Sequence, residues 1–138
     1  MTFWIIIIST LLSLTAQKQV DSVVVVVDQS VDVESITKKE LREIYTLKKQ
    51  NWQDGNRIFV ADYKGSNHLR SEFYDKMGYK ITSIKRIWLR AQFTGTTIPP
   101  KVVTSPEEMK KIVTTKPGTI GYLPKKEVET GQKIILVL

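Results

Sequence analysis

The chain has 138 residues, and its 21 lysine and arginine residues against 14 aspartate and glutamate residues give a formal net charge of +7. This charge suits an acidic partner such as phosphate, nucleic acid, anionic lipid or an acidic protein. The basic residues stand in scattered pairs rather than in one tract, which favours a solvent-exposed basic surface. The sequence has no cysteine, which excludes thiol chemistry, disulfide bonds and thiolate metal sites.

The first 16 residues resemble a secretory signal peptide. Residues 3–14 are apolar apart from three hydroxyl side chains, and this run is shorter than the about 20 residues of a membrane-spanning helix. Ala16 is small enough to precede a cleavage site. We therefore predict a signal peptide over residues 1–16, export to the periplasm, and a single domain over residues 20–138. An uncleaved N-terminal membrane anchor is the alternative.

The next segments predict a strand, a helix and a loop. Val23–Val27 is an unbroken valine run, typical of a strand buried on both faces in a largely parallel sheet. Thr37 and Glu40 have the spacing of a capping box, which predicts a helix start. The apolar stripe of this helix consists of Leu41, Ile44 and Tyr45. Polar residues 48–56 then predict a loop.

The middle of the chain predicts a second strand and two helices. The strand is expected over Arg57–Ala61, and Gly65-Ser66 opens a helix that ends at Gly78. The apolar face of this helix consists of Leu69, Phe73 and Met77. Residues 81–93 predict another amphipathic helix, and Trp88 lies on its apolar stripe.

The last third predicts one helix and two strands. Ser105 is a good N-cap and Pro106 a good first helical residue, and this helix is expected to stop before Pro117-Gly118. Strands follow over residues 119–123 and 134–138. Strands that alternate with helices predict an α/β sandwich with right-handed crossovers.

Six short motifs occur in order along residues 23–128. They are Thr37…Glu40-Leu41…Ile44-Tyr45, Trp52-Gln53-Asp54-Gly55, Phe73, Trp88 with Phe93-Thr94-Gly95, Pro99-Pro100, and Pro117-Gly118-Thr119-Ile120-Gly121-Tyr122. In this order they resemble the small exported phosphate-transporter-like solute-binding proteins of bacteria. The resemblance covers only the second lobe of the type II periplasmic binding protein fold. It implies a single three-layer, Rossmann-like α/β lobe.

The resemblance also implies an anion site. In phosphate-binding relatives the matching stretch carries an arginine four residues before a Ser-Gly-Thr sequence, and the anion lies between two lobes. Here Ser66 matches the serine, whereas Asn67 and His68 replace the glycine and threonine, and Asp62 stands at the arginine position. A carboxylate at that position repels phosphate, although Arg70 can compensate.

The start of the helix at Ser66 offers donors to such an anion, because its first amides, those of Asn67, His68 and Leu69, have no helical partner and the helix dipole favours negative charge. The candidate ligand-binding residues are Ser66, Asn67, His68, Arg70, Thr94 and Gly95, the last two in a second donor-rich turn. Two alternatives remain open: Ser66 is only a helix cap, or the hydroxyls of the Thr94 turn satisfy their own backbone.

Other polar and aromatic residues predict no further chemistry. His68 is the only histidine and has no partners at metal-binding or catalytic spacing, so we expect no metal or cofactor. The basic residues near Trp88 lie on the solvated flank of their helix, so we expect no nucleic-acid partner. Trp52 is expected to pack, or to fold as a lid over Leu47.

Two functions remain open at this stage. The first is a non-enzymatic exported solute-binding-like protein that recognises phosphate or a related oxyanion in phosphate uptake, as the resemblance implies. The second is a protein-interaction module without ligand binding, in which the same lobe docks a second copy or a periplasmic or membrane protein. An enzyme is not expected, because the sequence has no nucleophile–base pair, metal-ligand cluster or P-loop motif.

Overall fold

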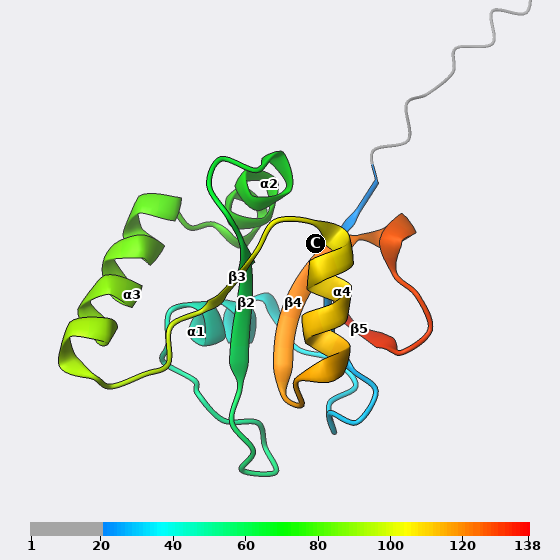
Figure 1. The fold of residues 1–138 in the computed structure, drawn as a ribbon, viewed down its shortest axis with the longest axis horizontal. Helices are drawn as coiled ribbons and strands as arrows, with labels where there is room; N and C mark the ends of the chain where they lie inside the picture. Colours follow the sequence, from blue (N-terminus) through cyan, green and yellow to red (C-terminus); the bar gives the residue numbers. More distant parts are fainter. Residues whose placement is uncertain (1–20) are drawn as a thin grey trace, which may run out of the picture.

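The structure, a computed structural model, describes residues 21–138, which form a five-stranded sheet covered by helices (Figure 1). The strand order is β3-β2-β4-β1-β5. The strands are β1 (Val23–Asp28), β2 (Phe59–Tyr63), β3 (Lys101–Val103), β4 (Thr119–Pro124) and β5 (Gln132–Val137). The helices are α1 (Lys38–Tyr45), α2 (His68–Met77), α3 (Ile81–Thr94), α4 (Pro106–Thr115) and the short 3₁₀ helix η1 (Lys125–Glu127). The predicted signal peptide lies outside the described residues.

The sheet is mixed rather than largely parallel. Strand β2 runs parallel to β3 and β4, whereas β1 runs antiparallel to both of its neighbours, β4 and β5. All five valines of Val23–Val27 are fully buried, as predicted. The predicted strand direction was wrong, because an unbroken apolar run indicates burial on both faces but does not specify how the neighbouring strands run.

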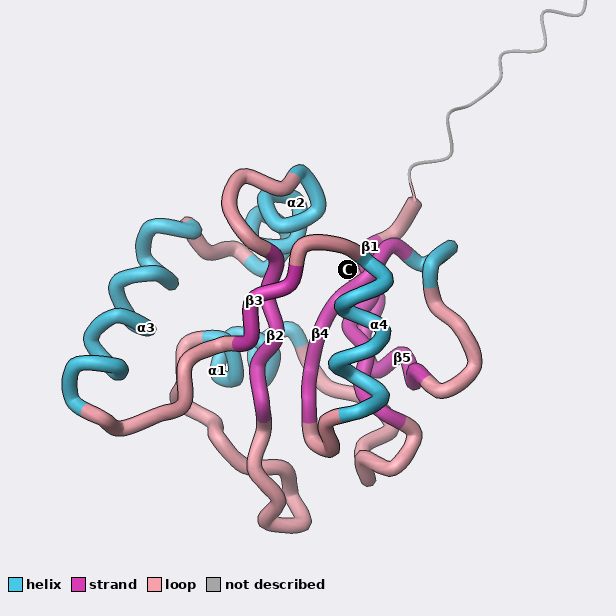
Figure 2. Tube along the Cα trace, viewed as in Figure 1, coloured by secondary structure: helices cyan, strands magenta, loops and turns pink. Residues whose placement is uncertain are grey.

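Helices cover both faces of the sheet, which makes three layers, as the family resemblance implied (Figure 2). Successive side chains of a strand point to opposite faces. On β4, Tyr122 stacks on Phe73 of α2 with ring centroids 3.7 Å apart. The neighbouring Gly121 instead faces Met109 and Val113 of α4. Helices α1 and α2 therefore pack on one face, and α4 packs on the other.

Several predicted boundaries need correction. Strand β2 ends at Tyr63 rather than Ala61, and α2 begins at His68 because Asn67, not Ser66, is its N-cap. Strand β3 was not predicted, because it has only three residues and follows two prolines. The predicted caps at Thr37 and Ser105 are confirmed, and Thr37 forms the complete capping box with Glu40. Within residues 21–138, no helix combines the length and apolar character needed to cross a bilayer.

At the turn of Pro117-Gly118 the backbone packs closely against another part of the chain. The carbonyl of Gly118 accepts hydrogen bonds from the indole N–H of Trp52 (3.0 Å) and the amide of Phe59 (3.1 Å). Gly118 has φ +83°, and a Cβ there would collide with the carbonyl oxygen of Arg57. Trp52 is buried and packs, so it is not a lid.

Gly118→Ala is expected to lower the free energy of unfolding by about 3 kcal/mol, because a left-handed conformation and overpacking each cost on the order of 1–3 kcal/mol. The control is Gly55→Ala, which has a similar φ of +87° but open space around the Cβ, so it should cost only about 1 kcal/mol. Urea unfolding measures both. Equal losses for the two variants would contradict the close approach at Gly118.

Candidate functional site

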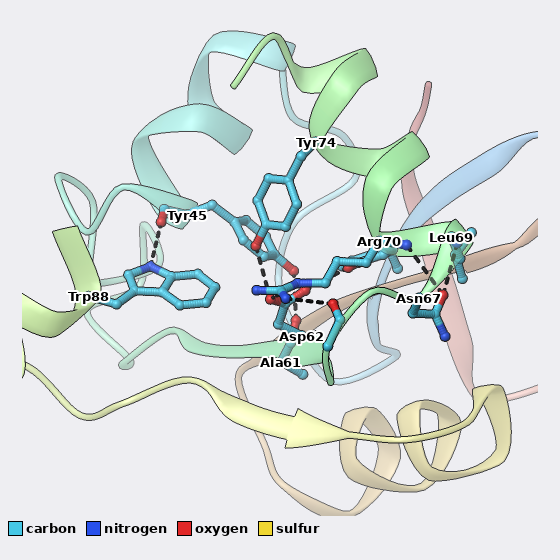
Figure 3. A network of polar contacts seen from close by, with 10 residues as sticks. Tyr45, Ala61, Asp62, Asn67, Leu69, Arg70, Tyr74 and Trp88 are labelled. Carbon is cyan, nitrogen blue, oxygen red and sulfur yellow. Dashed lines mark hydrogen bonds and ion pairs between the residues drawn. The ribbon is translucent and has the colours of Figure 1, made fainter. Parts of the chain in front are cut away.

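The candidate site lies where the chain leaves β2 and enters α2. A turn at Gly65, with φ +67°, reverses the chain after β2. The Asn67 side chain then accepts hydrogen bonds from the amides of Leu69 (2.9 Å) and Arg70 (3.4 Å). Asparagine is among the strongest N-caps, which explains why α2 starts one residue after it. Figure 3 shows the Asn67 side chain turned towards these amides.

The amides of three consecutive residues remain free at this turn. Within the described part of the chain, the N–H groups of Ser66, Asn67 and His68 have no hydrogen-bond partner. Ser66 and His68 are exposed and Asn67 is half-buried. The amide of Leu69, which we expected to be free, is instead satisfied by Asn67. The turn therefore presents three amide donors and the Ser66 hydroxyl to solvent.

Arg70 points into the protein rather than into solvent. Its Nε donates to Asp62 Oδ2 at 2.9 Å, and Asp62 and Arg70 are only 1% and 5% exposed. Its Nη1 donates to the carbonyl of Gly65 at 2.8 Å. The Arg70 guanidinium therefore neutralises the Asp62 charge and holds the Gly65 turn from inside.

Two tyrosines complete the surroundings of the Asp62 carboxylate. Tyr122 donates its hydroxyl to Oδ1 at 2.6 Å, and Tyr74 donates to Oδ2 at 3.1 Å. In Figure 3, Arg70 and Tyr74 converge on Asp62 from α2. Burial raises the pKa of Asp62, and the hydrogen bond from Tyr122, the charge of Arg70 and the hydrogen bond from Tyr74 offset part of this rise.

From the sequence, Asp62 is recognisable only as a departure from the arginine of phosphate-binding relatives. Its pairing with Arg70 and its two tyrosine donors are not apparent from the motifs. The available indication was a carboxylate inside an apolar strand, which needs a buried partner. The partner is Arg70, eight residues later on the helix that follows this strand.

Thr94 and Gly95 lie far from this turn, so the structure does not bring all six predicted residues together. Thr94 lines a pocket together with Leu47 and Gln50. In the chain it comes shortly before the amino end of β3. The turn at Ser66 follows the carboxyl end of β2, which is parallel to β3. A five-residue strand is about 16 Å long, so no small anion can contact both turns.

The Thr94 turn also satisfies its own polar groups. The Thr94 hydroxyl donates to the carbonyls of Arg90 and Ala91 and lies 3.0 Å from the Thr96 hydroxyl. Gly95 caps the end of α3 in the left-handed conformation, with φ +63°. This arrangement favours the self-satisfied turn, which was one of the two alternatives at this position.

The remaining candidates behave as packing or surface residues. Trp88 is buried, and its indole N–H donates to the carbonyl of Tyr45 at 2.8 Å. The neighbouring Lys85, Arg86 and Arg90 are exposed, as predicted. In residues 21–138, no group of three or more histidine, aspartate, glutamate or cysteine residues could hold a metal ion.

The fold is similar to that of several solved phosphate receptors. An ABC-type phosphate transport receptor from Vibrio cholerae superposes with a TM-score of 0.67 at 22% identity, over 83% of this chain and 45% of that one. The second structure is a protein from Clostridium perfringens, assigned as a phosphate ABC transporter substrate-binding protein and solved with bound phosphate. Its TM-score is 0.71 at 18% identity, over 83% of this chain and 44% of that one. PstS from Borrelia burgdorferi superposes with a TM-score of 0.63 at 19% identity, over 83% of this chain and 46% of that one.

These likenesses identify the class of fold. The chain has the α/β fold of one lobe of the type II periplasmic binding proteins, as the resemblance of the sequence motifs implied, and it spans less than half the length of these three structures. No family model matches the sequence, and no curated protein matches it.

Removal of either partner of the buried ion pair should destabilise the protein strongly. Asp62→Asn or Arg70→Met alone should cost about 3–5 kcal/mol, because each leaves a buried charge uncompensated. The double variant should cost clearly less than the sum of the two, as unfolding by urea measures. Additive losses would show that the two side chains do not depend on each other.

Alkaline pH should unfold the protein through its buried tyrosines. Burial, with the Asp62 charge as a second cause, raises the pKa of Tyr45, Tyr74 and Tyr122. Above a pH of about 10 the unfolded chain loses phenolic protons that the folded state retains, so stability falls as pH rises.

The half-buried Tyr79 is best replaced by phenylalanine for this measurement, because the four remaining tyrosines are all buried. We then expect tyrosinate absorbance to rise in one step together with the loss of circular dichroism. Tyrosinate absorbance that rises while the fold remains intact would contradict the burial of these hydroxyls.

Proposed function

We propose that this protein is a non-enzymatic, exported solute-binding-like protein that binds phosphate or a related oxyanion at the turn of Gly65–His68. The observation that carries the proposal is the set of three free, consecutive amides beside the Ser66 hydroxyl. Such a turn at a helix start is a favourable place for an anion. The fold adds support, because it is shared with a phosphate transport receptor and with a substrate-binding protein solved with bound phosphate.

Arg70 has a positioning role in this proposal. Its bond to the Gly65 carbonyl fixes the turn, so the amides do not have to be ordered when the anion arrives. Its charge is compensated by Asp62, so the anion is bound by amide and hydroxyl dipoles more than by a full positive charge. We therefore expect weak binding, with a dissociation constant in the millimolar range.

Two parts of the proposal concern location and role. Residues 1–16 direct export to the periplasm, or else anchor the chain at a membrane. The protein is then associated with phosphate uptake through an ABC transporter. The sequence motifs support both parts, and so does the transport role of the proteins from Vibrio cholerae and Clostridium perfringens that share the fold.

An NMR titration with phosphate at constant ionic strength tests the site. The amide signals of Ser66, Asn67 and His68 should shift at millimolar phosphate. Ser66→Ala should weaken binding by up to about tenfold, because a hydrogen bond to a charged group contributes about 1.5–3 kcal/mol and part of this is replaced by water. Thr94→Ala, the control, should leave binding unchanged. An absence of chemical-shift changes at this turn would contradict the proposal.

Asp62→Asn should raise the affinity for phosphate several-fold while it lowers stability. The substitution removes the negative charge that compensates Arg70, so the turn gains the field of an unpaired guanidinium. The titration is made at low temperature, with circular dichroism to confirm that the variant is folded. Unchanged affinity in a folded variant would show that Arg70 has no influence at the turn.

The alternative function, a protein-interaction module without ligand, is favoured by one observation. The Arg70 guanidinium beside the turn is already neutralised by a buried carboxylate, unlike a site built for a strongly bound anion. On this alternative the lobe docks a second copy, or a periplasmic or membrane protein. Light scattering coupled to size-exclusion chromatography distinguishes the two functions. A monomer that binds phosphate excludes the alternative, and a dimer that does not bind phosphate supports it.

A further inference from the structure

The basic residues are scattered along the chain, but the excess of basic over acidic residues lies almost entirely in one segment. Residues 76–106 contain six basic residues and no acidic residue, which accounts for +6 of the net charge of +7. These residues are Lys76, Lys80, Lys85, Arg86, Arg90 and Lys101. Three of them lie on α3, a helix without any acidic residue. Among the described residues, only Lys76 of the six forms an ion pair.

The same helix exposes two large apolar side chains. Leu89 is 55% and Phe93 83% exposed, and they lie one turn apart. The orientation of α3 is fixed by its buried side, where Ile84 and Trp88 pack and the Trp88 indole donates to Tyr45. Leu89 and Phe93 therefore face outward because the helix is held by the opposite stripe. In Figure 1, α3 lies at the left edge of the molecule.

Cations flank this apolar pair. Residues three or four apart are neighbours on a helix surface. Leu89 is four residues after Lys85 and three after Arg86, and Phe93 is three residues after Arg90. Ile98, in the segment that follows α3, is also 48% exposed. The outer face of α3 thus combines exposed apolar side chains with unpaired positive charges.

We propose that the outer face of α3 docks on an anionic lipid bilayer. Phe93 and Leu89 enter the boundary between headgroups and acyl chains, while Lys85, Arg86 and Arg90 bind lipid phosphates. This combination is the one that interfacial helices use, with apolar burial and attraction to anionic lipid acting together. An acidic soluble partner would also match the charges, but it would need an apolar pocket of its own for Phe93, whereas a bilayer has an apolar layer directly beneath its anionic surface.

This docking surface is separate from the oxyanion turn. The turn follows the carboxyl end of β2, whereas Phe93 and Thr94 end α3 near the amino end of the parallel strands. A protein docked through α3 would keep the amides of Ser66 and His68 in water. The two proposals can therefore fail independently.

The test uses the full chain with Phe93→Trp and vesicles of equal parts phosphatidylcholine and phosphatidylglycerol. Fluorescence is read as the difference from the unsubstituted protein, which removes the contribution of the native tryptophans. We expect F93W to shift to shorter wavelength and to be quenched by brominated lipid in these vesicles, but not in pure phosphatidylcholine. Val137→Trp is the control, because Val137 is also an exposed apolar side chain, 55% exposed, but lies on β5, at the other edge of the sheet from β3.

Charge variants in the F93W background complete the test. Lys85→Ala with Arg86→Ala should weaken vesicle binding by roughly 25-fold, since each basic residue near an anionic surface contributes about fivefold. The matched pair Lys38→Ala with Lys39→Ala, equally exposed at the start of α1, should change binding less than about threefold. Leu89→Ser should weaken binding by roughly tenfold.

Three results would overturn the proposal. The first is an F93W signal that is the same in buffer and in anionic vesicles. The second is an equal loss for the two charge pairs, which would indicate attraction by net charge alone. The third is a shift that depends on protein concentration without lipid, which would assign the surface to a second copy of the chain.

Discussion

The buried ion pair between Asp62 and Arg70 is the interaction on which both the fold and the candidate site depend. It joins β2 to α2, and the Tyr122 hydroxyl joins β4 to the same carboxylate. Burial of two charges is costly unless they are paired and hydrogen-bonded, and here the carboxylate accepts from three side-chain donors. Because Arg70 also holds the Gly65 carbonyl, the same pair sets the shape of the turn that carries the free amides.

Local patterns in the sequence predicted much of the fold. The capping box of Thr37 and Glu40, the Ser105 cap and the valine run all depend on neighbours in sequence, and they appear as expected. The direction of β1 and the existence of β3 depend on distant strands, and no local pattern encodes them. The cap of α2 was misplaced because Ser66 and Asn67 are both good caps, and only the turn geometry chooses between them.

The candidate site could be predicted in part. Its position at the start of α2 followed from the resemblance and from the chemistry of helix starts. The inward orientation of the Arg70 side chain could not be predicted from the spacing of residues in the sequence. It depends on the carboxylate and the tyrosines that three separate elements bring together. Thr94 and Gly95 looked similar to the site by composition, but the parallel pairing of β2 and β3 places them at the other end of the sheet.

The protein is one α/β lobe with an amide-lined turn whose nearby charge is compensated from inside. If the proposed function holds, an oxyanion binds at the turn while the ion pair behind it stays intact. Crystals soaked in arsenate and measured by anomalous diffraction test this binding mode most directly. We expect an arsenic peak within hydrogen-bond reach of the amides of Ser66, Asn67 and His68, with Arg70 still paired to Asp62. A peak only at another surface, or Arg70 withdrawn from Asp62 to reach the anion, would contradict this binding mode.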